Sequence, residues 1–152
     1  MRVEEHRALV LRFYEEVWAL GNLEFAHEVF ADDYVRHDLR PSAPSAGPEG
    51  QAKIAGAFRS AFPDLEWHVD LVLGDGDLVA ARWTAAGTHS GAWDDVAATG
   101  KKVRFSGVNI FRFGGAGKVV EIWNHRDDLG LMEQLGASVF AGAVPSGSGE
   151  ST

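Results

Sequence analysis

Residues 67–88, WHVDLVLGDGDLVAARWTAAGT, contain two β-strands joined by a tight turn. The first half alternates polar residues with apolar ones, which are Trp67, Val69, Leu71 and Leu73. That period of two is typical of a strand with one buried face. Gly74–Asp77 is a hairpin turn signal, and residues 78–88 supply the second strand. We therefore predict an antiparallel hairpin within a larger sheet.

The other elements lie on both sides of this hairpin. Two further strands are predicted at 102–113 and 118–125, with a turn at 114–117 between them. Apolar spacing and capping residues predict helices at 4–20, 22–30 and 48–61, a helical turn at 128–135 and a short strand or turn at 34–37. This order indicates an α+β fold, with N-terminal helices packed in a curved four-stranded antiparallel sheet plus one short strand. Such a sheet encloses a cone, whose open end suits a small-molecule pocket.

Composition limits the possible partners. The 152 residues include 14 Lys and Arg against 22 Asp and Glu, and this acidic balance argues against nucleic-acid binding. The absence of cysteine excludes disulfides, thiolate metal sites and cysteine nucleophiles. No apolar run reaches the roughly 20 residues that cross a bilayer, and the N-terminus lacks a signal-peptide pattern. We expect one cytoplasmic domain over residues 1–140 and a disordered tail at 141–152, with no nucleic-acid or membrane partner.

Familiar catalytic motifs are missing from the sequence. There is no HExxH motif and no His pair at i, i+4, so no metal site is predicted. The glycine-rich stretches GDGD and GGAG each join two strands, whereas a phosphate cradle joins a strand to a helix. No GxSxG motif is present either.

A few polar residues could still carry chemistry. Asn109 shares a strand face with Phe105 and Phe111, and an amide there needs a substrate, water or protein partner. In the segment 123–128, WNHRDD, alternation places Asn124 and Arg126 on one face; this segment is either part of a site or a strand leaving the sheet with a structural ion pair.

Two histidines and an arginine have competing interpretations. His37 beside Asp38 is either an oriented acid/base pair or a solvated loop pair. His89 is expected to be a structural histidine, and Arg82 an ion-pair partner.

Several short segments resemble the SnoaL-like polyketide cyclases, in order from about residue 5 to 137. They are Phe62-Pro63-Asp64, residues 79–84, 87–91 and 99–101, Phe111-Arg112-Phe113, residues 117–123 and Gln134-Leu135-Gly136. The resemblance implies a cystatin-like, nuclear-transport-factor-2-like cone. It also implies a homodimer or larger homo-oligomer that works without cofactor or metal.

The resemblance also implies a reaction, an intramolecular aldol ring closure. The family's catalytic aspartate and its assisting histidine correspond to Asn124 and Asn109 here. An amide cannot be a general base near neutral pH, although it can donate a hydrogen bond to an enolate oxygen. Proton transfer would then fall to Asp127, His37 or Asp38.

We therefore expect an enzyme that acts on a hydrophobic polycyclic or polyketide-type small molecule by acid/base chemistry, as a cyclase, hydratase or isomerase. Its substrate-contacting residues would be Tyr14, Trp18, Phe58, Phe105, Phe111, Trp123 and Arg126. One alternative is a binding protein that has lost the catalytic acid. A second is water activation of the epoxide-hydrolase type by Arg126, Asp127 and Asp38, and a third is an association domain.

Overall fold

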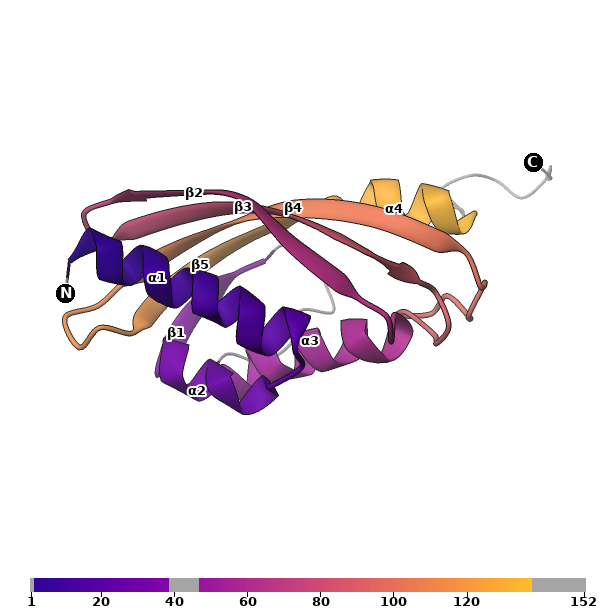
Figure 1. The fold of residues 1–152 in the computed structure, drawn as a ribbon. Coiled ribbons are helices and arrows are strands. Elements are labelled where there is room, and N and C mark those ends of the chain that lie inside the picture. The colour runs from indigo at the N-terminus through magenta and orange to yellow at the C-terminus, as the bar shows by residue number, and fades with distance from the viewer. Residues whose placement is uncertain (1, 39–46, 138–152) are drawn as a thin grey trace.

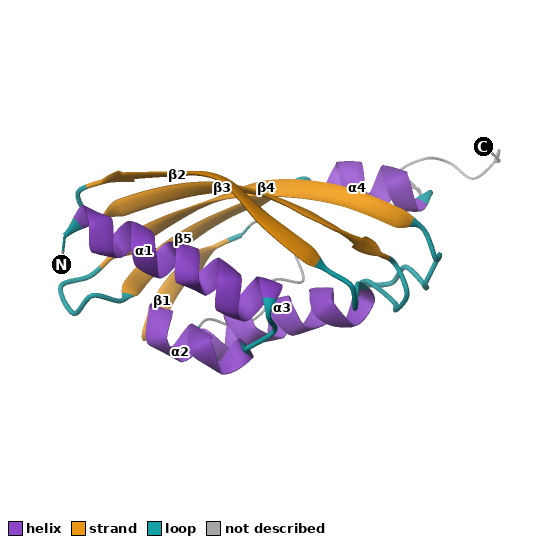
Figure 2. Ribbon diagram, in the orientation of Figure 1, coloured by secondary structure: helices purple, strands orange, loops and turns teal. Residues whose placement is uncertain are grey.

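A computed structural model describes residues 2–38 and 47–137 of the chain. It contains one five-stranded sheet in the order β1-β5-β4-β3-β2 (Figures 1 and 2). The strands are β1 (Phe30–His37), β2 (Glu66–Asp75), β3 (Leu78–Thr88), β4 (Lys102–Phe113) and β5 (Val119–Arg126). The helices are α1 (Val3–Phe13), α2 (Ala26–Val29), α3 (Pro48–Ala61) and α4 (Asp128–Leu135). The fold is the predicted α+β fold, and the tail expected to be disordered lies outside the described residues.

The curved sheet arches over three helices. Helices α1, α2 and α3 lie together on one side of it (Figure 1). Helix α4 lies beside the beginning of β4, where Gln134 bonds the backbone of Arg104. Every second residue of β4 faces the helices, and Phe111 is fully buried there against Phe13 and Phe30. The predicted alternation of β3 and β4 therefore builds the core.

Strand β1 differs from the sequence prediction. It begins at Phe30, where a helix was expected to end, and it pairs in parallel with β5 rather than joining an antiparallel sheet. The expected second helix is reduced to a 3₁₀ turn at Leu23–Phe25 followed by the four residues of α2. The reason is tertiary, because hydrogen bonding to the edge of β5 overrides the local helix pattern.

Strand β2 also departs from simple alternation. A register shift between Val69 and Leu71 turns Val72 toward the core. Leu71 and Leu73, predicted to be on the buried face, are instead 49% and 64% exposed on the outer face of the sheet. One irregular residue reverses the face of every residue after it.

The first predicted helix is not α-helical throughout. After α1 it continues as a π-helical segment, Tyr14–Ala19. π-Helical insertions are rare and occur often at functional sites. This one carries two large aromatic side chains, Tyr14 and Trp18, to the inner face of the sheet, where both are buried.

Candidate active site

A small cavity lies between the inner face of the sheet and the helices. Its volume is about 30 Å³, enough for about two water molecules. Its apolar wall consists of Phe13, Trp18, Ile54, Phe58, Trp67, Trp83, Phe105 and Ile122. Its polar wall consists of Arg36, Gln51, Asn109, Asn124, His125 and Arg126. A polycyclic ligand would therefore bind only if part of this wall moved.

Two asparagine side chains form the centre of the polar wall. Asn109 and Asn124 are directly paired on β4 and β5, and Asn109 Nδ2 donates to Asn124 Oδ1 at 2.7 Å. Asn109 Oδ1 accepts from the Tyr14 hydroxyl at 2.7 Å and from Trp83 Nε1 at 2.8 Å. Burial raises the pKa of Tyr14 well above its usual value, so the hydroxyl keeps its proton. We call these four side chains the amide relay.

The position of Trp83 depends on a glycine in the neighbouring strand. Gly107 pairs with Trp83, and a Cβ at Gly107 would lie 2.5 Å from the indole ring. The indole also stacks on Trp67 at 4.1 Å between ring centroids, and Trp67 stacks on Trp18 at 4.5 Å. Glycine at 107 therefore allows the aromatic stack that holds Trp83 against Asn109.

Each of two arginines on the cavity wall pairs with an aspartate two residues later. Arg36 Nη2 lies 2.6 Å from Asp38, and both side chains are only 4% exposed. Arg126 Nε lies 2.5 Å from Asp128, and its guanidinium lies 4.5 Å from the centre of the Phe58 ring. Two carboxylates thus contact the cavity wall, each through an arginine.

The structure brings together six of the residues that the sequence singled out as site residues. Asn109, Asn124, Trp18, Phe58, Phe105 and Arg126 all line the cavity. Tyr14 lies behind Asn109, to which its hydroxyl donates, and does not itself line the cavity. Phe111 is a core residue.

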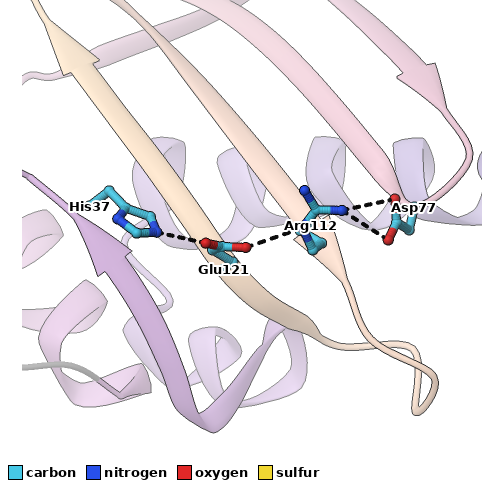
Figure 3. A network of polar contacts seen from close by, with 4 residues as sticks. All are labelled: His37, Asp77, Arg112 and Glu121. Carbon is cyan, nitrogen blue, oxygen red and sulfur yellow. Dashed lines mark hydrogen bonds and ion pairs between the residues drawn. The ribbon is translucent and has the colours of Figure 1, made fainter.

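Three other site predictions, His37, Trp123 and Asp127, do not line the cavity. His37 and Trp123 stack on each other on the outer face of the sheet. Figure 3 shows His37 bonded to Glu121, which also bonds Arg112. The hydrogen bond from His37, followed by that from Arg112, lowers the pKa of Glu121.

Asp127 has a structural contact. Its carboxylate caps α4 by accepting from Gly130 N at 2.9 Å. Arg126 pairs with Asp128, and Arg36 pairs with Asp38. The catalytic roles suggested for His37 and Asp127 stay predictions.

His89 and Arg82, the other two polar residues considered, make structural contacts. His89 is buried, and its Nδ1 accepts from the backbone N–H of Thr99 at 3.2 Å. Arg82 forms an ion pair with Asp70, on the exposed face of the sheet.

Sequence reasoning missed Arg36, Gln51 and Trp83 as site residues. Gln51 had a usable signal, because its spacing from Ile54 and Phe58 places all three on one face of α3. Arg36 had none, since it reaches the cavity only because β1 pairs in parallel with β5.

Two possible features are not found in residues 2–38 and 47–137. No three histidine, aspartate or glutamate side chains gather there as a metal site would require. None of the helices in those ranges is long and apolar enough to cross a membrane.

Comparisons with known proteins agree with the fold. None of the curated proteins matches the chain in sequence. Among solved structures, AclR from Streptomyces galilaeus, a proposed hydroxylase, is 29% identical with a TM-score of 0.76, over 89% of this chain and 98% of its own. IdmH from Streptomyces antibioticus, a proposed polyketide cyclase, is 31% identical with a TM-score of 0.72, over 87% and 99%.

A third structure supports the fold alone. TsrD from Streptomyces laurentii is 24% identical with a TM-score of 0.80, over 91% of this chain and 99% of its own. The family model described as SnoaL-like polyketide cyclase matches residues 8–135, which include the whole amide relay and both arginine–aspartate pairs. The chain therefore belongs to the SnoaL-like polyketide cyclase family.

Proposed function

We propose that this chain is a cofactor-free enzyme that closes or rearranges a hydrophobic, polyketide-type substrate through an enolate. The observation that carries the proposal is a buried carboxylate, Asp38, bonded to a side chain of an aromatic-lined cavity. The aromatic wall suits a flat apolar substrate, and Asn124 supplies a hydrogen-bond donor for the oxygen that becomes negative.

Asp38 is the proton acceptor in this proposal. Among the described carboxylates that contact the cavity wall through an arginine, it is the more buried, at 4% against 30% for Asp128. Arg36 holds this carboxylate in place beside the cavity wall. Asn124 cannot take this role because its amide is neutral.

For an aldol ring closure, the proposed steps balance without an added reagent. Asp38 removes a proton from the carbon between two carbonyl groups, and Asn124 donates to the resulting enolate oxygen. The enolate carbon then forms a bond to a ketone carbon of the same molecule. The ketone oxygen becomes an alkoxide and takes the proton back from Asp38, so the product is an isomer of the substrate.

Turnover by single variants tests this assignment. The substrate carries a 1,3-dicarbonyl side chain and a separate ketone on one aromatic body, and ring closure is followed by absorbance. We expect Asp38→Asn to lower kcat at least about a hundredfold, as loss of a general base does. Asp128→Asn and His37→Gln serve as matched controls and should change kcat less than about threefold.

Two further measurements keep the test decisive. Loss of the buried partner of Arg36 can destabilise the fold, so melting curves must show that Asp38→Asn is folded. In the pH profile of the natural protein, the acidic limb should disappear only in Asp38→Asn. If Asp128→Asn abolishes turnover instead, the base is wrongly assigned; if no substrate of this kind turns over, the enzyme proposal fails.

A binding protein without catalytic activity is the second candidate. It is favoured by the amides at both family positions, and by the cavity wall itself, which includes no carboxylate among the described residues. In that case aromatic ligands would bind and raise the melting temperature, with no turnover by any variant.

We also propose that two copies associate through the outer face of the sheet. This is supported by the exposed leucines Leu71 and Leu73 and by the half-buried Trp123 on the same face. Light scattering should give a dimer for the natural chain and a monomer for Leu73→Glu.

A further inference from the structure

Trp83 determines which end of the Asn109 amide is the oxygen and which is the NH₂, and we call this orientation the direction of the relay. An indole N–H only donates, so the atom of Asn109 that faces Trp83 Nε1 at 2.8 Å must be an acceptor. The Tyr14 hydroxyl reaches the same oxygen, Oδ1. Rotating the Asn109 amide by half a turn would place its NH₂ against the indole N–H, with two donors facing each other.

The orientation of the Asn109 amide in turn determines the orientation of the Asn124 amide. Because Asn109 presents its NH₂ to β5, the atom of Asn124 that receives it is Oδ1, at 2.7 Å. The other end of the Asn124 amide is then Nδ2, which is buried and has no hydrogen-bond partner. The last group of the relay, Asn124 Nδ2, is therefore a hydrogen-bond donor on the cavity wall.

The other unpaired groups on the cavity wall are of the same kind. Arg36 Nε and Nη1 and Trp67 Nε1 are buried without partners, and every one is an N–H donor. No buried side-chain oxygen of the described wall residues is left unpaired in this way. An unpaired buried donor is costly, so water or a ligand oxygen must supply the acceptors for this wall.

We propose that Trp83, acting through Asn109 and Asn124, makes this cavity selective for a ligand oxygen that only accepts hydrogen bonds. The ligand class is an aromatic ketone or its enolate, whereas amines and ammonium groups are rejected. Trp83 is a positioning residue here, since it does not touch that oxygen. This proposal rests on the proposed function for the aromatic body of the ligand. It deepens that function by stating that the ligand group facing Asn124 must be a hydrogen-bond acceptor.

Binding of three matched probes tests the selectivity. The probes are 2-acetylnaphthalene, 2-ethylnaphthalene and 1-(2-naphthyl)ethylamine, which share one aromatic body. Titrations of the full chain are followed by ¹H–¹⁵N spectra of the side-chain amides and indoles. We expect the ketone to bind at least about tenfold more tightly than the hydrocarbon, with the amine weakest, and to shift the Asn124 NH₂ signal.

Variants separate the relay from simple packing. Asn124→Asp replaces the terminal donor by an acceptor, so it should reverse the ketone–amine preference by at least about tenfold. Trp83→Phe should weaken that preference, because Asn109 becomes free to turn. Tyr14→Phe is the matched control, and it should keep the preference because Trp83 still fixes Asn109.

The free protein gives a second measurement in case Trp83→Phe does not fold. Scalar couplings across hydrogen bonds should link Trp83 Nε1 to Asn109 Cγ, and Asn109 Nδ2 to Asn124 Cγ. If these couplings are missing, the direction of the relay is wrong. If ketone and hydrocarbon bind equally, or if none of the probes binds, the ligand class is wrong. None of these experiments measures turnover. A negative result in the binding or the coupling experiment therefore does not decide the proposed enzyme activity, which the Asp38→Asn experiment tests.

Discussion

Replacement of Asn109 by leucine removes the centre of the amide relay and keeps the branched shape and the number of heavy atoms of the side chain. The Tyr14 hydroxyl and the Trp83 indole N–H then lose their acceptor, and both side chains are at least 96% buried. Each orphaned donor costs about 1–3 kcal/mol, so the loss of stability should be about 2–6 kcal/mol. For a chain of this length, 1 kcal/mol shifts the melting temperature by about 2–4 °C, so a drop of about 10 °C is expected.

A double-mutant cycle with Tyr14→Phe isolates the hydrogen bonds from packing. Tyr14→Phe alone leaves Asn109 with the Trp83 donor and should cost about 1 kcal/mol. In the Tyr14→Phe background, Asn109→Leu orphans one donor fewer, so it should cost less by about 1–3 kcal/mol. Urea unfolding curves followed by tryptophan fluorescence measure all four proteins. If the two costs simply add, Tyr14 and Asn109 are not coupled and the reasoning about the relay is refuted.

Three other substitutions have defined outcomes. Gly107→Ala should cost about 1–3 kcal/mol because its Cβ would meet the Trp83 ring, whereas Gly115→Ala, with open space around it, should cost little; equal melting temperatures would contradict this. Hydrogen bonds from the Thr88 N–H and hydroxyl lower the pKa of Asp64, so its contribution is present above the unfolded-state pKa and is lost as pH falls through the folded one. Melting temperature should therefore fall less steeply below about pH 4 in Asp64→Asn than in the natural chain. Asp127→Ala should cost about 1 kcal/mol through loss of the α4 cap, and a hundredfold loss of turnover in it would make Asp127 a catalytic candidate again.

Local sequence patterns were sufficient to predict the bounds of one helix and of two strands that are neighbours in the sheet. The strands at 78–88 and 102–113 and the helix at 48–61 have the predicted bounds, because period and turn residues determine them. The prediction for β2 was right only up to Val69. The irregularity after that residue adds one position, and composition does not show where a bulge falls.

The candidate site was predicted in part for the same reason. Alternation placed Asn109 with Phe105 and Phe111, and Asn124 with Arg126. It did not place the two asparagines opposite each other, since their pairing depends on a second register shift near Phe113. Arg36 reaches the cavity, with Asp38 behind it, through the parallel contact of β1 with β5, which closes a loop of about ninety residues. Contacts of that range follow from tertiary packing and have no local signature.

The position of Asn124 is suited to the carboxylate that the family carries there. Asn109 Nδ2 already donates to Oδ1 of residue 124, and a carboxylate oxygen would accept the same bond. The second carboxylate oxygen would replace Nδ2, which has no partner, in a cavity whose wall also carries donors of Arg36. We therefore expect Asn124→Asp to fold with a melting temperature within about 3 °C of the natural chain, although a carboxylate is normally costly to bury.

Its kinetics should separate binding from chemistry. A base at residue 124 lies on the wall itself, so kcat for the aldol closure should rise, while KM also rises because one donor to the ketone oxygen is lost. Asn124→Leu is the matched control, and it should bind the ketone less tightly with no gain in kcat. If Asn124→Asp is strongly destabilised, the donors of the wall do not reach this position. The unpaired Asn124 amide would then be a packing feature, and the site would have no use for an anion.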